Sequence, residues 1–151
     1  MSTHYKGSRT ELRALNSFIK LIRAANAVSN DVANTYTAAG LTESQFGVLE
    51  ALLHLGPLHA CDLAAKLLSS GGNLTLVLDN LEKRSLVRRE RGVEDRRFIT
   101  VHLTLQGRTL IEELFPRHVA GVVARFAVLS ASEQEELSRL CRKLGRQLKE
   151  D

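Results

Sequence analysis

The stretch VRRERGVEDRRF, Val87 to Phe98, places five arginines and three acidic residues around a single glycine. From Lys83 to Arg97 the chain carries seven basic and three acidic residues, a net charge of +4. This equals the formal net charge of the whole 151-residue chain. Charge concentrated in so short a segment favours a contact surface for a polyanion over general solubility.

The sequence around this stretch predicts a β-hairpin. The segments LVRRER and FITVHLT (86–91 and 98–104) predict two strands joined by GVEDRR. One face of the second strand carries the alternating apolar residues Ile99, Val101 and Leu103. Within the turn, the spacing of Asp95 and Arg97 would allow an ion pair that fixes the direction of the guanidinium before a partner arrives.

Two short helices are predicted just before the hairpin, one from about Ala60 to Leu68 and one that begins after the break SSGG. The apolar stripe of the second helix is Leu74, Val77, Leu78 and Leu81. Two short helices, a tight turn and a hairpin are typical of a winged helix-turn-helix. On the outer face, Leu76 would suit contact with a thymine methyl group.

The short polar residues near the start of this second helix, Ser70, Asn73 and Thr75, are suited to bind phosphates or base edges. Capping of the helix start is an alternative role for each of them, and it is compatible with DNA contact. The hairpin arginines could enter an adjacent minor groove, where the negative potential favours guanidinium groups.

Further helices are predicted on both sides of this segment. An amphipathic helix runs from Thr10 to about Thr37, and a capping box of Thr42 with Gln45, stapled by Leu41 and Phe46, opens another that ends near Leu55. The remaining start signals are Thr104, for a helix to about Ala127 that Pro116 should kink, and the capping box Ser130 with Glu133. The apolar faces of the first and last two helices exceed what a monomer of this size would bury, which favours a two-fold dimer.

Several classes of protein are disfavoured. There is no apolar run of 18 residues, and the N-terminal segment lacks the apolar region of a secretory signal, so we expect no membrane association and a cytoplasmic location. The chain has no Gly-rich phosphate loop, nucleophile elbow or HExxH motif, so we expect no enzyme activity and no cofactor. The segment HLGPLHACD matches no standard zinc spacing, and we expect no metal. Packing is favoured over redox sensing for Cys61.

The segment DLAAKLLSSGGNLTLVLDNLEKRSLVRRERGVEDRRFITVHLTLQG, Asp62 to Gly107, resembles the MarR (multiple antibiotic resistance regulator) family of bacterial transcription factors. The elements that carry the resemblance are the DLA start, the leucine-rich helix ending in LEKR, LV-x-R-x-R, the Asp-x-Arg of the wing and V-x-LT-x-x-G. One departure is Ser85, where the family usually has glycine. If the backbone there is left-handed, serine would cost roughly 1 kcal/mol relative to glycine.

The resemblance implies a mainly α fold with a small β-hairpin wing, as one domain over residues 1–151. It implies a winged helix-turn-helix lobe at about 40–104 and dimerisation helices at about 8–38 and 105–150. It also implies a homodimer on pseudo-palindromic double-stranded DNA, most simply a repressor released by a small, often aromatic or phenolic, molecule. The implied DNA-binding residues are Ser70, Asn73, Thr75, Leu76, Arg89, Arg91, Asp95, Arg96 and Arg97, with Asp95 as the internal partner of the wing.

Tyr36, His54 and His59 are guesses for the effector pocket, motivated by polar side chains near the place where the lobes should meet. Two alternatives stay open at this point. One is a thiol- or redox-responsive regulator of the same fold, and the other is a winged-helix module that binds a protein partner or RNA. Salt-dependent duplex affinity that is lost when the hairpin arginines are neutralised would separate DNA binding from a protein partner.

Overall fold

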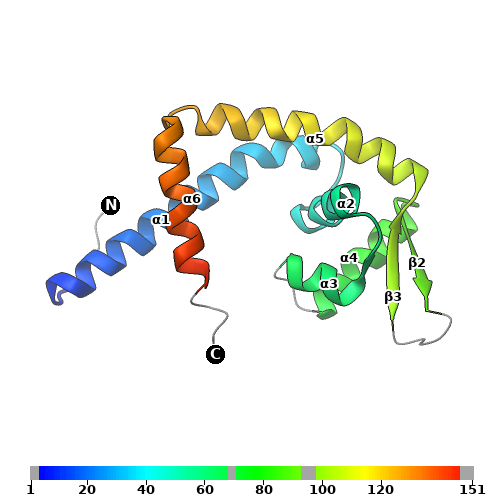
Figure 1. Cartoon of the computed structure of the whole chain (residues 1–151), viewed down its shortest axis with the longest axis horizontal. Helices are drawn as coiled ribbons and strands as arrows, with labels where there is room; N and C mark the ends of the chain where they lie inside the picture. The colour runs from blue at the N-terminus through cyan, green and yellow to red at the C-terminus, as the bar shows by residue number, and fades with distance from the viewer. Residues whose placement is uncertain (1–3, 68–70, 93–97, 147–151) are drawn as a thin grey trace. The chain divides into compact units, whose positions relative to one another are not determined.

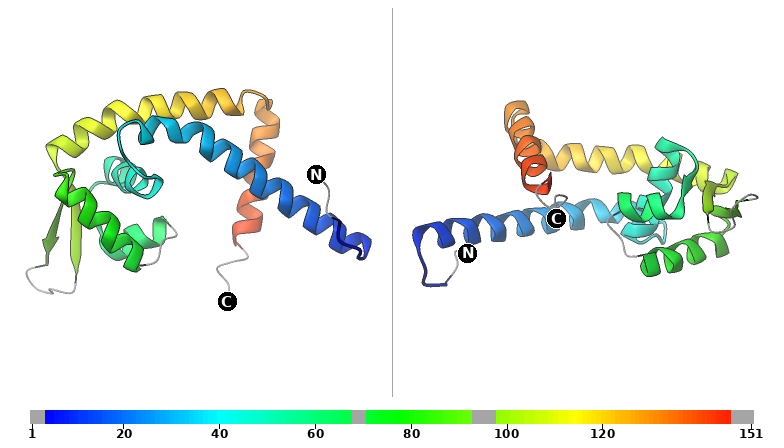
Figure 2. Two further views of the ribbon diagram at one scale, coloured as in Figure 1. Left: turned by 180° about the vertical axis from the view of Figure 1, so that it is seen from behind. Right: turned by 60° about the horizontal axis from the view of Figure 1, so that its bottom comes forward.

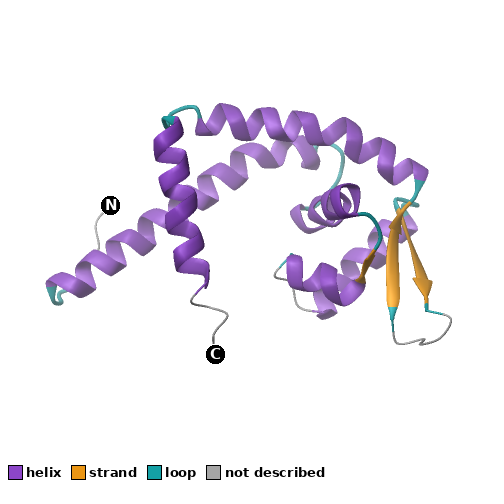
Figure 3. Cartoon of the chain, in the orientation of Figure 1, coloured by secondary structure: helices purple, strands orange, loops and turns teal. Residues whose placement is uncertain are grey.

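The fold is mainly helical with one small sheet, as predicted. The computed structural model describes residues 4–67, 71–92 and 98–146 (Figure 1). The helices are α1 (Arg9–Thr37), α2 (Glu43–Leu55), α3 (Ala60–Lys66), α4 (Gly71–Lys83), α5 (Leu105–Phe126) and α6 (Ala131–Arg146). The strands are β1 (Leu58–His59), β2 (Val87–Arg91) and β3 (Ile99–Leu103), shown in orange in Figure 3.

The chain forms two compact units. One unit spans residues 32–119 and contains the sheet, α2, α3 and α4. The other combines residues 1–31 with 120–151 and contains α6. The long helices α1 and α5 each contribute to both units. The bounds of these two units are not those of the winged helix-turn-helix lobe and the dimerisation helices that the resemblance implies.

The sheet has the strand order β1-β3-β2, with both pairings antiparallel. The predicted hairpin is confirmed, with Val87 opposite Leu103 and Arg91 opposite Ile99. The third strand, β1, was missed because two residues after Pro57 are too short to display an alternating pattern. Its His59 lies opposite Thr100 of β3.

The core of the 32–119 unit gathers apolar side chains from all its elements. Its fully buried residues are Val48, Leu49, Leu52, Leu63, Leu81, Val87, Val101 and Ile111. The predicted stripe of α4 is buried as expected, since Leu74, Val77, Leu78 and Leu81 are at most 8% exposed. Burial of this stripe orients α4, so that its opposite face points outward.

The helix starts follow the predicted capping signals. The Thr42 hydroxyl accepts from the Gln45 backbone N–H at 3.2 Å, and the Thr42 N–H donates to the Gln45 side chain at 3.0 Å. At the start of α6, the N–H of Ser130 donates to a Glu133 carboxylate oxygen at 2.8 Å. Each bond satisfies an N–H group that the first turn of a helix leaves without a partner. The helix α5 continues through Pro116, and the kink expected there stays a prediction.

The end of α4 has the left-handed residue considered above: Ser85 has a φ of +57°. Its N–H donates to the Glu82 carbonyl at 2.9 Å, and the Leu86 N–H donates to the Leu81 carbonyl at 3.0 Å. This pair of bonds is the Schellman arrangement, which ends the helix and turns the chain directly into β2.

No described residue of the other unit is buried, across 4–31 and 120–145. Its large exposed apolar side chains include Phe18 and Ile22 on α1, Val123 on α5, and Leu140 and Leu144 on α6. In the described part of the chain, no single helix is long and apolar enough to cross a membrane; α5 and α6 meet that test only as a bent pair.

Candidate nucleic-acid interface

The outer face of α4 is the first part of the candidate site. Leu76 is 60% exposed, although every other leucine of this helix is buried. Asn73 and Thr75 flank it and are exposed as well. These side chains provide hydrogen-bonding groups and one apolar contact. The edges of base pairs in a major groove present matching donors, acceptors and the thymine methyl group. Ser70, predicted to join this set, lies outside the described residues.

The strand β2 carries the second part of the site. It lies beside α4 (Figures 1 and 2). Arg88 is exposed and pairs with Glu90 at 2.9 Å, and Glu90 also lies 3.3 Å from the His102 ring. Arg91, at the end of the strand, is exposed. Arg91 therefore presents positive charge on the wing, and Arg88 presents an exposed guanidinium that is paired with Glu90. The predicted contacts Arg96 and Arg97, and the predicted pairing of Asp95 with Arg97, fall on residues 93–97, outside the described ranges.

Arg89 has partners that the sequence reading did not foresee. Its Nε and Nη2 atoms donate to Glu82 Oε2 at 3.0 and 2.7 Å, and Nη2 also lies 2.6 Å from Asp79 Oδ1. Its backbone N–H donates to Glu82 Oε1 at 3.0 Å. These bonds lower the pKa of Glu82 and raise the pKa of Arg89, because each partner stabilises the charged form of the other. Arg89, expected to contact DNA, is thus occupied within the protein.

Two further contacts hold α4 and the sheet in place. The Arg84 guanidinium donates to the carbonyl oxygens of Gly40 and Ala39 at 2.7 and 3.1 Å, which ties the end of α4 to the turn after α1. The Thr104 hydroxyl donates to the Ser85 carbonyl at 2.6 Å and accepts from the Gly107 N–H at 2.9 Å. Thr104 therefore caps α5, as predicted, and at the same time fastens that cap to the end of α4.

Comparisons with known proteins agree with this geometry. A family model described as MarR family matches residues 41–99. This chain is 32% identical to YkoM, an uncharacterised HTH-type transcriptional regulator of Bacillus subtilis. The similarity extends over 133 residues, which are 88% of this chain and 86% of YkoM. The chain is 31% identical over the same length to MhqR, another HTH-type transcriptional regulator of that organism, covering 92% of it. This chain belongs to the MarR family.

A solved structure of similar fold is that of BpsR from Bordetella bronchiseptica, whose DNA binding is regulated by 6-hydroxynicotinic acid. The similarity has a TM-score of 0.78 at 28% identity, and it covers 85% of this chain and 98% of BpsR. The curated relatives of this MarR-family chain are transcriptional regulators and not enzymes. The winged helix-turn-helix fold predicted from the sequence is therefore confirmed.

The three residues guessed for an effector pocket do not form one group in this MarR-family protein. Tyr36 is buried, and its ring stacks on Phe46 with centroids 5.1 Å apart. The ring of His118 lies 4.8 Å from that of Phe46, and the exposed His54 meets the edge of the Phe115 ring at 4.6 Å. Burial raises the pKa of the Tyr36 hydroxyl. Tyr36 and His54 thus border one aromatic cluster.

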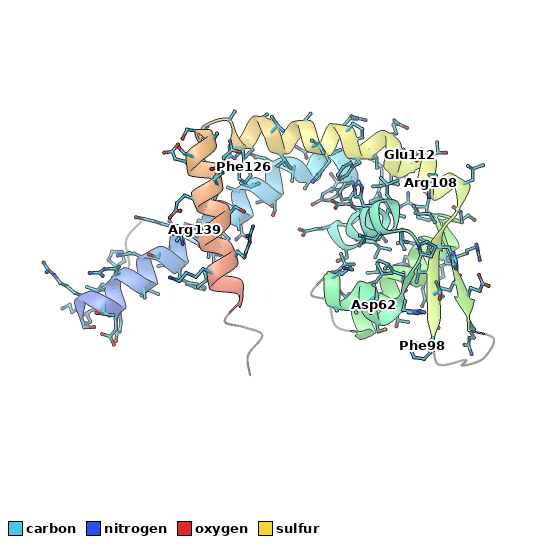
Figure 4. The ribbon with its side chains drawn as sticks, viewed as in Figure 1. Asp62, Phe98, Arg108, Glu112, Phe126 and Arg139 are labelled. Atoms are coloured by element: carbon cyan, nitrogen blue, oxygen red, sulfur yellow. The ribbon has the colours of Figure 1, made fainter. Side chains whose placement is uncertain are left out.

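That aromatic cluster has members that the sequence reading missed, namely Phe46, Phe115 and His118. The Nδ1 atom of His118 is buried and has no hydrogen-bond partner among the described residues. Phe46 was expected only to form the hydrophobic staple with Leu41, and no local signal marks Phe46, Phe115 or His118 as neighbours of Tyr36. His59 lies elsewhere, on β1, with its Nδ1 atom 3.3 Å from the Thr100 hydroxyl and its ring 5.5 Å from that of Phe98. Phe98 lies just before β3, at the end of the strand away from α5 (Figure 4).

The expectation that Cys61 packs inside the protein is wrong. Cys61 is exposed, and its sulfur lies 3.9 Å from the Asp62 carboxylate. The reason is its position on α3, where Leu63 takes the buried place two residues later. Within the described ranges, no group of three or more His, Cys, Asp or Glu side chains is placed to hold a metal ion.

Proposed function

We propose that this protein is a sequence-specific, DNA-binding transcriptional regulator that reads double-stranded DNA with α4. The observation that carries the proposal is the outward face of α4. Leu76 is exposed there beside Asn73 and Thr75, while the opposite face of the helix is buried. The exposed arginines Arg88 and Arg91 on the adjoining strand supply positive charge for the phosphate backbone. Ser70, Asp95, Arg96 and Arg97, which lie outside the described residues, belong to the same proposal through the family resemblance.

The active form is a homodimer in this proposal. The unit made of residues 1–31 and 120–151 has no buried residue in its described part, yet it exposes Phe18, Ile22, Val123, Leu140 and Leu144. A folded unit without an interior of its own needs a covering surface, because exposed apolar area of this extent is unfavourable in water. A second copy of the chain supplies a self-complementary surface, and two-fold symmetry then matches a pseudo-palindromic operator.

Regulation by a small aromatic acid is the most economical mechanism for release from DNA. It draws on the similarity to BpsR, whose DNA binding responds to 6-hydroxynicotinic acid. We place the effector near the aromatic cluster bordered by Tyr36 and His54. The buried His118 Nδ1 in this cluster has no hydrogen-bond partner among the described residues, and a polar group of the effector would supply one. Binding would change the spacing of the two α4 helices in the dimer, and repression would end because one rigid duplex cannot fit both spacings.

Selection from random double-stranded DNA at near-physiological salt tests the proposal. The wild type is expected to enrich a palindrome, and Leu76→Ala is expected to relax the preference at one position in each half-site. Arg91→Ala should weaken all duplexes about equally and lower the salt slope by about 1, as the loss of one phosphate contact does. If the wild type enriches no sequence, the proposed function is overturned.

The effector part has its own measurement. Addition of 6-hydroxynicotinic acid, as a probe of the aromatic-acid class, should raise the melting temperature of the wild type and weaken its binding to the selected palindrome. Substitution of His118 by Phe, which keeps an aromatic ring at this position but removes both ring nitrogen atoms, should reduce that response. A response of the same size in His118→Phe would remove this residue from the proposed site.

A further inference from the structure

Arg89 is bound within the protein by four polar contacts, and all of them reach α4. Both carboxylate oxygens of Glu82 are used: Oε1 accepts from the backbone N–H of Arg89, and Oε2 accepts from its guanidinium. The Nη2 atom of the same guanidinium also pairs with Asp79 Oδ1. The side chain of Arg89 is 26% exposed, compared with 57% for the neighbouring Arg88. The Nε and Nη2 donors of the guanidinium are therefore already engaged.

We propose that Arg89 is a positioning residue, which clamps the recognition helix α4 to the first strand of the wing and acts on DNA through that geometry without touching a phosphate. This inference rests on the proposed DNA-binding function. It replaces the direct DNA contact that the family resemblance implied for the residue.

The first reason is that α4 and β2 need such a contact. Only three residues, 84–86, connect the last residue of α4 to the first of β2, and Ser85 among them has the left-handed backbone that serine tolerates poorly. This turn fixes where the strand begins but leaves its tilt against the helix to other contacts. The Arg89 side chain bridges the two elements beyond the turn. Its Nε and Nη2 atoms both donate to Glu82 Oε2, and Nη2 also reaches Asp79, so several bonds together restrict angle as well as distance.

The second reason is electrostatic. Asp79 and Glu82 are three residues apart on α4, so they lie on one side of the helix. Two uncompensated carboxylates there would repel each other and a nearby phosphate backbone. Arg89 lies within 2.7 Å of both, so it offsets this charge at the helix that is proposed to approach DNA.

Glu82→Gln tests the clamp because the two possible roles of Arg89 predict opposite signs. The substitution keeps the shape of the side chain but replaces one acceptor oxygen by an NH2 group, so either the guanidinium or the backbone N–H of Arg89 loses its acceptor on Glu82. If Arg89 clamps, affinity for the selected palindrome falls about tenfold. If Arg89 is itself a DNA contact, affinity stays equal or rises, because a negative charge is removed and the guanidinium is set free.

Glu90→Gln is the matched control, since it removes the same charge from β2, at the residue next to Arg89. Its carboxylate pairs with the exposed Arg88 and approaches His102 of β3, so its described ion pairs stay within the hairpin and affinity should not fall. A loss of affinity in Glu82→Gln alone supports the clamp. An equal or greater affinity in Glu82→Gln overturns it.

Arg89→Lys gives a second reading that does not depend on Glu82. Lysine keeps the positive charge and can still serve a phosphate, but it lacks the planar fork that engages Glu82 and Asp79 through Nε and Nη2 together. The clamp predicts weaker binding with an unchanged dependence on salt, whereas a phosphate contact predicts near-wild-type binding. Melting temperatures of both variants above the assay temperature ensure that folded protein is compared.

These outcomes also separate the two proposals. A wild type that selects no palindrome overturns the proposed function itself, before any variant is compared. A wild type that selects one, together with Glu82→Gln or Arg89→Lys variants that bind as well or better, overturns only the role assigned to Arg89.

Discussion

Gly107, in the first turn of α5, is a position where a single methyl group should destabilise the fold. A Cβ atom on this residue would overlap the carbonyl oxygen of Leu86 and lie 2.8 Å from its carbonyl carbon. The Leu86 carbonyl has little room to move away, because it accepts from the Thr104 N–H at 3.2 Å. The adjoining Ser85 carbonyl is bonded to the Thr104 hydroxyl at 2.6 Å. We therefore expect Gly107→Ala to force apart the start of α5 and the start of β2.

The magnitude follows from the contacts involved. Forced overpacking of this kind costs about 1–3 kcal/mol. Displacement also weakens two hydrogen bonds, from Gly107 N–H to Thr104 and from Thr104 N–H to Leu86, at about 1 kcal/mol each. The better helix propensity of alanine returns about 1 kcal/mol. The net expectation is a loss of about 2–4 kcal/mol in the free energy of unfolding, or roughly 5–15 °C in melting temperature for a chain of this size.

Urea unfolding followed by circular dichroism measures this loss, and Gly145→Ala is the matched control. Gly145 lies in α6, and nothing would stand within 4 Å of its added Cβ. That substitution should leave stability unchanged or raise it by up to about 1 kcal/mol. If Gly107→Ala proves as stable as the wild type, the tight approach of α5 to Leu86 is refuted.

Three further predictions concern the helix end, the clamp and the dimer. Ser85→Gly should raise the free energy of unfolding by about 1 kcal/mol, because glycine adopts a φ of +57° without strain; no gain in urea unfolding would contradict this. The lowered pKa of Glu82 means that its stabilising effect is present above the ordinary value of 4.5 and is lost as pH falls through the lower folded value. The difference in free energy of unfolding between wild type and Glu82→Gln should therefore shrink in acid. A difference that grows in acid would contradict this prediction. Phe18→Glu should yield a monomer in analytical ultracentrifugation, while Leu105→Glu, at an exposed leucine of the other unit, should not; an unchanged dimer in Phe18→Glu would remove α1 from the interface.

Some features follow from the sequence because their partners are close along the chain. The capping residues Thr42, Thr104 and Ser130 bond groups three residues away, so their spacing alone specifies the bonds. The left-handed backbone at position 85 was considered only because the family usually has glycine there, and the structure shows it. Hydrophobic periodicity likewise assigns α4 its buried stripe, because a helix has a fixed angle per residue.

Tertiary structure decided the features that depend on how separate elements dock. Arg89 looked like the other hairpin arginines, and only the placement of β2 against α4 brings it to Glu82 and Asp79. The strand β1 exists only because β3 offers it a partner. Exposure of Cys61 depends on which face of α3 meets the core.

The proposed effector region depends on tertiary structure most of all. Tyr36, Phe46 and His118 come from α1, α2 and α5, and no spacing along the chain relates them. The sequence by itself determined the family, the order of the helices and the wing, since these depend on local hydrogen bonds and periodic burial. Only the folded structure decided which charges are left for a partner and which are consumed inside the protein, because an ion pair between elements depends on distances of a few ångströms that no local pattern encodes.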